Sequence, residues 1–220
     1  MEHAIGNILP SAIGIAISPV PMIAAVLMLL SPRARGTSLG FLGGWLVGIV
    51  AAVVAFTLLG NVIPDGDPDA SHPTRGVVLL LLGILLVLLA VRQVRSRESE
   101  PTMPAWMAAV DKMTVGRGAL LAFLLAAVNP KNLAMAAAAG VDISAADLEA
   151  GAVAGTVVVF ALVAASSVAV PVVAYLANPR AMAGPLTRLK DWLVANNATV
   201  MAVLFLVIGV TVIGKGIGSF

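Results

Sequence analysis

One short polar stretch inside a long apolar run carries the residues of this chain with the clearest chemical potential. VNPKN, at residues 128 to 132, interrupts an apolar run that begins at Ala119 and ends near Val141. Its Lys131 is the only ionisable residue that lies well inside any apolar run. A charge at the centre of a membrane helix costs at least about 2.5 kcal/mol, so such a residue normally faces a polar cavity. We therefore predict that Lys131 attracts an anionic group such as phosphate, sulfate or carboxylate.

The residues around Lys131 support a polar site, although one alternative stays open. Pro130 removes a backbone donor and breaks a helix, and the carbonyls it frees at membrane depth need partners or must line a cavity. Asn129 and Asn132 flank the break and could hydrogen-bond the exposed backbone or a ligand. The alternative is that this segment is tilted or re-entrant, and that Lys131 extends to the outer headgroups.

A second polar interruption lies 111 residues earlier, in ISPVP at residues 17 to 21. At the same offset Gly40 maps to Gly151 and Gly44 maps to Gly155, which favours an internal duplication. Broken helices at matching positions of two halves are typical of a transport site. The predicted substrate-binding set is Ser18, Pro19, Pro21, Asn129, Pro130, Lys131 and Asn132.

The composition is that of an integral membrane protein. Of the 220 residues, 60% are hydrophobic and only 11% are charged, whereas the surface of a soluble domain needs more charge. The net charge of +2 gives no basic surface for nucleic acid. The absence of cysteine excludes disulfides and dithiol redox chemistry, and His3 and His72 lie outside the apolar runs. We therefore expect no enzyme activity, no metal and no cofactor.

Six apolar runs approach the length of about 20 residues that a membrane helix needs. The expected fold is thus all-α, with six transmembrane helices, of which the first and fourth are broken by proline. Pro171 is expected to kink or end the fifth span early. The six runs are Ile8–Leu30, Leu39–Val62, Val77–Val94, Ala119–Val141, Ala150–Ala177 and Asn197–Ile213.

The distribution of basic residues predicts the orientation. Three loops that share one side hold ten of the thirteen Lys and Arg residues, among them Arg33 and Arg35 after the first span. The positive-inside rule places these loops in the cytoplasm and both termini outside. The acidic loop Pro64–Pro73 fits the outer side. Met1 to Asn7 contain no Lys or Arg and do not resemble a signal peptide.

Three spans in each half predict a 3+3 inverted-topology repeat, because an odd number makes the second copy enter the membrane from the opposite side. The expected parts are a first repeat (1–95), a cytoplasmic linker (96–117) and a second repeat (118–220). Pro104–Met113 and Pro185–Val194 have the pattern of short interfacial helices. Finally, the glycines at four-residue spacing in the second span are expected to let another helix pack closely; they are Gly40, Gly44 and Gly48.

The chain resembles the GAP family, the glycolipid-addressing proteins of actinobacteria, which include sulfolipid-addressing (SfLAP-like) and glycopeptidolipid-addressing proteins of the lysine exporter (LysE) superfamily. The resemblance lies in residues 17 to 48, in VNPKN, and in residues 191 to 217. It implies a bacterial inner-membrane protein that moves an anionic glycolipid towards the cell surface, beside a larger lipid exporter. Matching positions are Ser18, Pro19, Pro21, Ser31, Pro32, Arg33, Arg35, Gly44, Trp45, Asn129, Pro130 and Lys131.

Arg33 and Arg35 suit an anionic headgroup at the inner leaflet, or serve only as topology determinants. Two other functions stay open: export of a small solute such as an amino acid, and a scaffold that recruits a lipid exporter. The lack of Asp, Glu or His in the middle of any span disfavours a cationic substrate and a carboxylate proton relay. Small-residue faces favour a homodimer.

Overall fold

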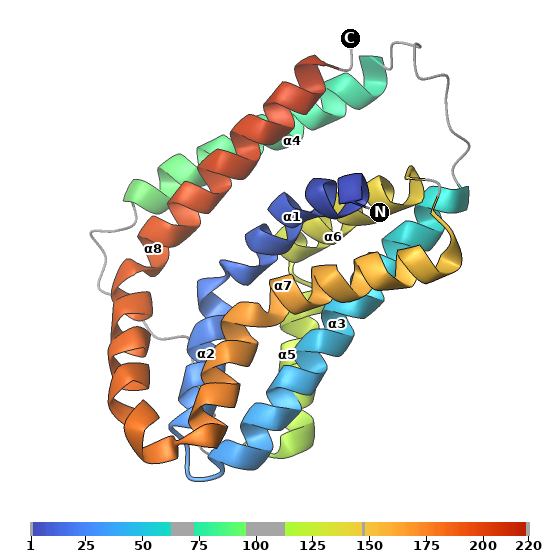
Figure 1. Cartoon of the computed structure of the whole chain (residues 1–220). Helices are drawn as coiled ribbons and strands as arrows, with labels where there is room; N and C mark the ends of the chain where they lie inside the picture. The colour runs from blue at the N-terminus through green and yellow to red at the C-terminus, as the bar shows by residue number, and fades with distance from the viewer. Residues whose placement is uncertain (1, 63–72, 96–112, 147, 219–220) are drawn as a thin grey trace. The chain divides into compact units, whose positions relative to one another are not determined.

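The computed structural model describes residues 2–62, 73–95, 113–146 and 148–218, and every regular element in these ranges is an α-helix (Figure 1). The helices group into two compact units. The first unit comprises Met1–Ile63 and Met103–Asp191, and the second comprises Pro64–Thr102 and Trp192–Phe220. In chain order the helices are α1 (Glu2–Ala16), α2 (Pro19–Leu29), α3 (Ala34–Val62), α4 (Pro73–Arg95), α5 (Val115–Ala127), α6 (Pro130–Ser144), α7 (Ala150–Ala177) and α8 (Pro179–Ile217).

Both predicted helix breaks are confirmed. α1 and α2 are bent by 56° at their junction, and α5 and α6 are bent by 63°. Pro19 begins α2 and Pro130 begins α6, where a missing N–H costs nothing because the first amides of a helix have no internal partner. Pro21 lies in the first turn of α2, where the missing amide hydrogen of a proline also costs nothing.

In the first unit each broken pair packs against the long helix of the other half of the sequence. α1 and α2 both contact α7, α5 and α6 both contact α3, and α3 contacts α7. α1 also packs against α6, and α2 against α3. The apolar core lies where these helices meet, around the fully buried side chains of Phe41, Trp45 and Phe160.

The predicted close approach at the glycines of α3 is confirmed, and the partner is α5. A Cβ atom added to Gly40 would lie 2.5 Å from the Val115 carbonyl oxygen, and one added to Gly48 would lie 2.7 Å from the Ala126 Cβ. A Cβ at Gly44 would collide with the backbone of Ala119. In contrast, Gly151, the counterpart of Gly40 in the second half, has open space around it. The match of Gly40 with Gly151 therefore does not extend to a shared packing role.

The second unit is built from α4 and the later part of α8, which cross at two glycines. A Cβ atom added to Gly83 would lie 2.9 Å from the Gly209 carbonyl oxygen, and one added to Gly209 would lie 3.0 Å from the Gly83 carbonyl oxygen. Glycine is needed at both positions because the two backbones are in direct contact.

α8 differs from the prediction, since it is one continuous helix of 39 residues. The expected interfacial helix Pro185–Val194 is its first part. Pro185 removes one amide, whose helical acceptor would be the carbonyl of Ala181, and Ala181 is exposed, so a partner outside the helix can satisfy that carbonyl. Leu186 is buried against Val26, Leu29 and Val172, so the apolar face of this segment packs on α2 and α7.

Three helices are long and apolar enough to cross a membrane, namely α3, α7 and α8. If each bent pair forms one span, the described part of the chain has up to five. α4 is not among these candidates. α7 continues to Ala177, so Pro171 does not end it early. The predicted helix Pro104–Met113, the acidic loop Pro64–Pro73 and most of the linker 96–117 lie outside the described residues.

Candidate functional site

The two helix breaks meet at Lys131. Asn129 caps α6, because its side-chain oxygen accepts a hydrogen bond from the Lys131 backbone amide at 3.0 Å. The Lys131 side chain then reaches the junction of α1 and α2. Its Nζ donates to the Ile17 carbonyl oxygen at 3.3 Å and to the Ser18 Oγ at 3.2 Å. Residues 113 positions apart in the sequence are thereby joined.

Lys131 is buried rather than extended to the headgroups. Lys131 is only 9% exposed, and Ser18 is 4% exposed. In the described part of the chain its ammonium contacts no carboxylate. Both hydrogen bonds are longer than the roughly 2.7–2.9 Å of strong charge-assisted bonds. The structure therefore disfavours the alternative in which Lys131 extends to the outer headgroups, and its positive charge is held only by two neutral oxygens.

The helix termini add to the positive potential beside Lys131. α2 and α6 both begin at the breaks, and the N-terminal end of a helix carries a partial positive charge. Ser18 stands at the N-cap position of α2 but makes no side-chain capping bond there; its hydroxyl accepts from Lys131 instead. An anion at this junction would meet an ammonium, a hydroxyl and two helix N-termini.

Asn132 bridges the second break from within. Its Nδ2 donates at 3.0 Å to the carbonyl of Leu125, in the last turn of α5. Asn132 is 1% exposed, and its Oδ1 has no hydrogen-bond partner among the described residues. A buried acceptor without a partner costs about 1–3 kcal/mol. Asn132 therefore links α5 and α6 across the break through its Nδ2, and among the described residues its Oδ1 is left as an acceptor without a partner.

The prolines of the predicted site shape it without offering polar contacts. Pro19 and Pro130 fix where α2 and α6 begin, and Pro21 is buried in the first turn of α2. They set the position of Ser18, Asn129 and Lys131, because a helix cannot continue through a proline without losing a hydrogen bond.

Arg33 and Arg35 do not join this site. Both are exposed, Arg33 in the turn between α2 and α3 and Arg35 in the first turn of α3, at the opposite end of α2 from Ser18. The 11 residues of α2 separate the two places by about 16 Å. Nearby, Pro32 is exposed and Ser31 is buried, with its Oγ donating to the Met28 carbonyl at 2.8 Å.

Two polar atoms of the structure were not foreseen from the sequence. The Ile17 carbonyl is a backbone acceptor, and the only sequence signal for it is its place just before the Ser-Pro break. Trp45 is fully buried in the core beside Gly44, and its Nε1 has no partner in the described part of the chain. In the described residues no group of three His, Cys, Asp or Glu side chains is placed to hold a metal.

These features define an all-helical membrane protein with two broken helices that meet at a buried cation. The family model of Sap, sulfolipid-1-addressing protein, matches residues 8–218, and the chain therefore belongs to this family. The match includes both helix breaks. Searches of curated proteins and of solved structures found no significant match.

Proposed function

We propose that this chain is a transport protein, not an enzyme, that helps to move an anionic glycolipid from the cytoplasmic side of a bacterial inner membrane towards the cell surface. The observation that carries this proposal is the buried ammonium of Lys131 at the junction of two broken helices. The lipid class is supported by the family, which is named for addressing a sulfolipid.

The partners of Lys131 at the junction are weak enough for an anion to replace them and then to leave again. At rest the ammonium is satisfied by the Ile17 carbonyl and the Ser18 hydroxyl, both at long distances. A sulfate, phosphate or carboxylate oxygen would bind Lys131 more strongly, because charge-assisted bonds are about twice as strong as neutral ones. When the anion leaves, Lys131 returns to its two neutral partners, so the empty site does not leave a bare charge in the membrane.

A six-span 3+3 inverted repeat is part of the proposal. It is supported by the reciprocal packing of the first unit, in which α1 and α2 pack on α7 while α5 and α6 pack on α3. α4 would supply the remaining span. With 23 residues it is about 35 Å long, which exceeds a hydrocarbon core of about 30 Å. In this arrangement α1–α4 and α5–α8 are the two copies.

The charges of the first unit support a cytoplasmic end at Arg33 and Arg35. The start of α5 lies beside the start of α3, since a Cβ at Gly118 would lie 3.2 Å from the Thr37 carbonyl oxygen. The start of α8 packs there through Leu186. This end also carries Arg117, Arg180, Arg188 and the Lys190–Asp191 ion pair, whereas the opposite end carries Glu2, Asp142 and Glu149. The positive-inside rule then places the N-terminus of α1 outside.

The proposal is tested by deleting the gene in its host and comparing surface-extractable with total lipids by mass spectrometry. The deletion is complemented with wild type, with Lys131→Met, or with Lys190→Met. Lys190 is the matched control, because it lies outside the junction and its partner is the neighbouring Asp191. We expect one anionic glycolipid to be lost from the surface and retained inside, and to be restored by wild type and Lys190→Met only.

Other outcomes point elsewhere. Unchanged surface lipids in the deletion would refute lipid addressing, and the culture medium would then be screened for a metabolite that no longer leaves the cell. Full rescue by Lys131→Met would refute transport through the junction and would favour a scaffold that recruits a larger exporter.

A further inference from the structure

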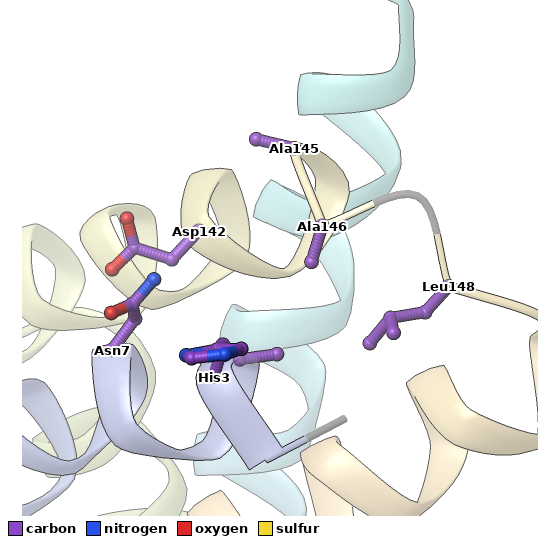
Figure 2. Close-up of a pocket in the computed structure, with 7 residues that line it drawn as sticks. His3, Asn7, Asp142, Ala145, Ala146 and Leu148 are labelled. Atoms are coloured by element: carbon purple, nitrogen blue, oxygen red, sulfur yellow. The ribbon is translucent and has the colours of Figure 1, made fainter.

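α1 and α6 are antiparallel neighbours that lead away from the Lys131 junction. α1 ends at the first break and α6 begins at the second, and the two helices contact each other. Their other ends, near Glu2 and Ser144, enclose an open hollow of about 340 Å³ (Figure 2). The hollow is lined by His3, Ala4, Asn7, Asp142, Ala145, Ala146 and Leu148.

The hollow has the chemistry of a site for hydroxyl groups. His3 and Asn7 are four residues apart and share one face of α1, and in Figure 2 Asn7 and Asp142 point towards each other with His3 beside them. Imidazole, amide and carboxylate groups can all hydrogen-bond a hydroxyl group. None of the described lining residues is Lys or Arg, and the carboxylate of Asp142 would repel an anion. The volume falls in the range of about 300–1,000 Å³ typical of small-molecule sites.

A flexible contact lies between the hollow and the Lys131 junction. A Cβ atom added to Gly14 would lie 2.9 Å from the Met135 Sδ. Gly14 lies on α1 between Asn7 and the break before α2, and Met135 lies on α6 between Lys131 and Asp142. Methionine has three rotatable bonds and can move aside without breaking a hydrogen bond. At this level α1 and α6 are therefore packed together through the flexible side chain of Met135, which lies against Gly14.

From this order of contacts we propose that the seam between α1 and α6 is the outer half of the transport route. Met135 is its plug, and the hollow at its end binds the uncharged, hydroxyl-bearing part of the lipid headgroup. The inference rests on the proposed function and extends it. Asn7 and Ile17 are ten positions apart, which corresponds to about 15 Å along a helix. The hollow and the Lys131 junction are therefore two separate binding sites along the same route.

The route is tested by cross-linking the seam, which is straightforward because the chain contains no cysteine. Gly14→Cys is combined with Met135→Cys, and the cells are oxidised and then reduced. The controls are the single variants Gly14→Cys and Met135→Cys, which cannot form the cross-link within the chain. We expect oxidation of the seam pair to stop export of the lipid and reduction to restore it, while each single variant exports throughout.

Export that continues with the seam fully cross-linked would overturn the route, and so would an equal loss of export in the oxidised single variants. Neither result would contradict the proposed function, which is tested by the effect of the gene deletion on surface lipids.

The ligand class is tested with protein in lipid nanodiscs that carries Ala145→Cys in the hollow. Its rate of reaction with a charged maleimide is measured with monohexosyl diacylglycerol or with phosphatidic acid, an anionic lipid without alcohol hydroxyls, in the bilayer. Gly6→Cys is the control, because Gly6 is exposed on α1 but does not line the hollow. We expect the hexosyl lipid to slow labelling of Ala145→Cys several-fold, and Asn7→Leu to abolish this protection. Equal protection by both lipids, or by neither, would overturn the assignment.

Discussion

At the scale of single residues, the central feature is a lysine whose partners are both neutral. Burying an ammonium group is costly unless it is paired, and Lys131 has only a carbonyl and a hydroxyl within reach. The Ser18 hydroxyl serves Lys131 in place of its usual role as a helix cap. In the resting arrangement the ammonium group thus lacks the stronger hydrogen bonds that it would form with a negatively charged partner.

The lack of a negatively charged partner predicts a specific stabilisation by anions. Sulfate added to the purified protein should raise the Tm of wild type more than that of Lys131→Met. A ligand at a hundred times its Kd stabilises the state that binds it by about 2.7 kcal/mol. The measurement is thermal unfolding in detergent, with chloride at equal ionic strength as reference. Because sulfate also stabilises proteins without binding, identical shifts in both proteins would contradict an anion site at Lys131.

At the scale of helices, the caps hold the breaks in place. Asn129→Ala should remove the bond to the Lys131 amide and cost about 1 kcal/mol, which is typical for loss of an N-cap. We expect lower lipid export together with a lower Tm, and recovery of both in Asn129→Ser.

Thr114→Ala is the matched control for the cap of α6. Thr114 caps α5 by accepting from the Arg117 amide at 3.4 Å, at the exposed start of that helix and away from the junction. It should lower the Tm slightly and leave export unchanged. Equal loss of export in both variants would show that the position of Lys131 does not depend on its cap.

The contact of α3 with α5 gives a second test at this scale. Gly44→Ala places a methyl group on the backbone of Ala119, whereas Gly43→Ala meets nothing within 4 Å. Gly44→Ala should destabilise the protein by about 1–3 kcal/mol, because the two backbones must move apart. Gly43→Ala should leave stability unchanged or raise it slightly, since alanine is the better helix former. Thermal unfolding of the two variants decides, and equal Tm values would contradict the close approach.

Helix breaks were predictable from the sequence, whereas helix continuity was not. Proline lacks an amide hydrogen, so Pro19 and Pro130 marked the breaks directly. Pro185 and Pro171 are also prolines, yet α8 and α7 continue through them. The difference lies in the surroundings, because a carbonyl freed by proline is tolerated wherever tertiary contacts or an exposed position supply a partner.

At the scale of the whole molecule, the charged ends of the first unit predict the topology. Glu149→Cys, at the acidic end, should react with a membrane-impermeant maleimide in intact cells. Arg188→Cys, at the basic end, should react only after permeabilisation, and wild type gives no background because it has no cysteine. The reverse pattern of labelling would invert the proposed orientation.

The sequence predicted the site more completely on α6 than elsewhere. Asn129, Pro130, Lys131 and Asn132 are adjacent, so their polarity stands out against the apolar run around them. The partner atoms of Lys131 and the hollow at His3, Asn7 and Asp142 arise only when α1 packs against α6. No local pattern reports a contact between residues more than a hundred positions apart. The predicted division into two sequential repeats stays a prediction.

The fixed place of Lys131 on α6 also has an electrical consequence. Carrying one elementary charge across a membrane changes its energy by about 2.3 kcal/mol for every 100 mV of voltage. Lys131 stays on α6, so no positive charge travels with the anion. A monovalent anion that crosses the membrane carries one net negative charge outward, and a divalent anion carries two. A potential that is negative inside therefore favours export of any anionic headgroup, and it does so in proportion to the valence of that headgroup.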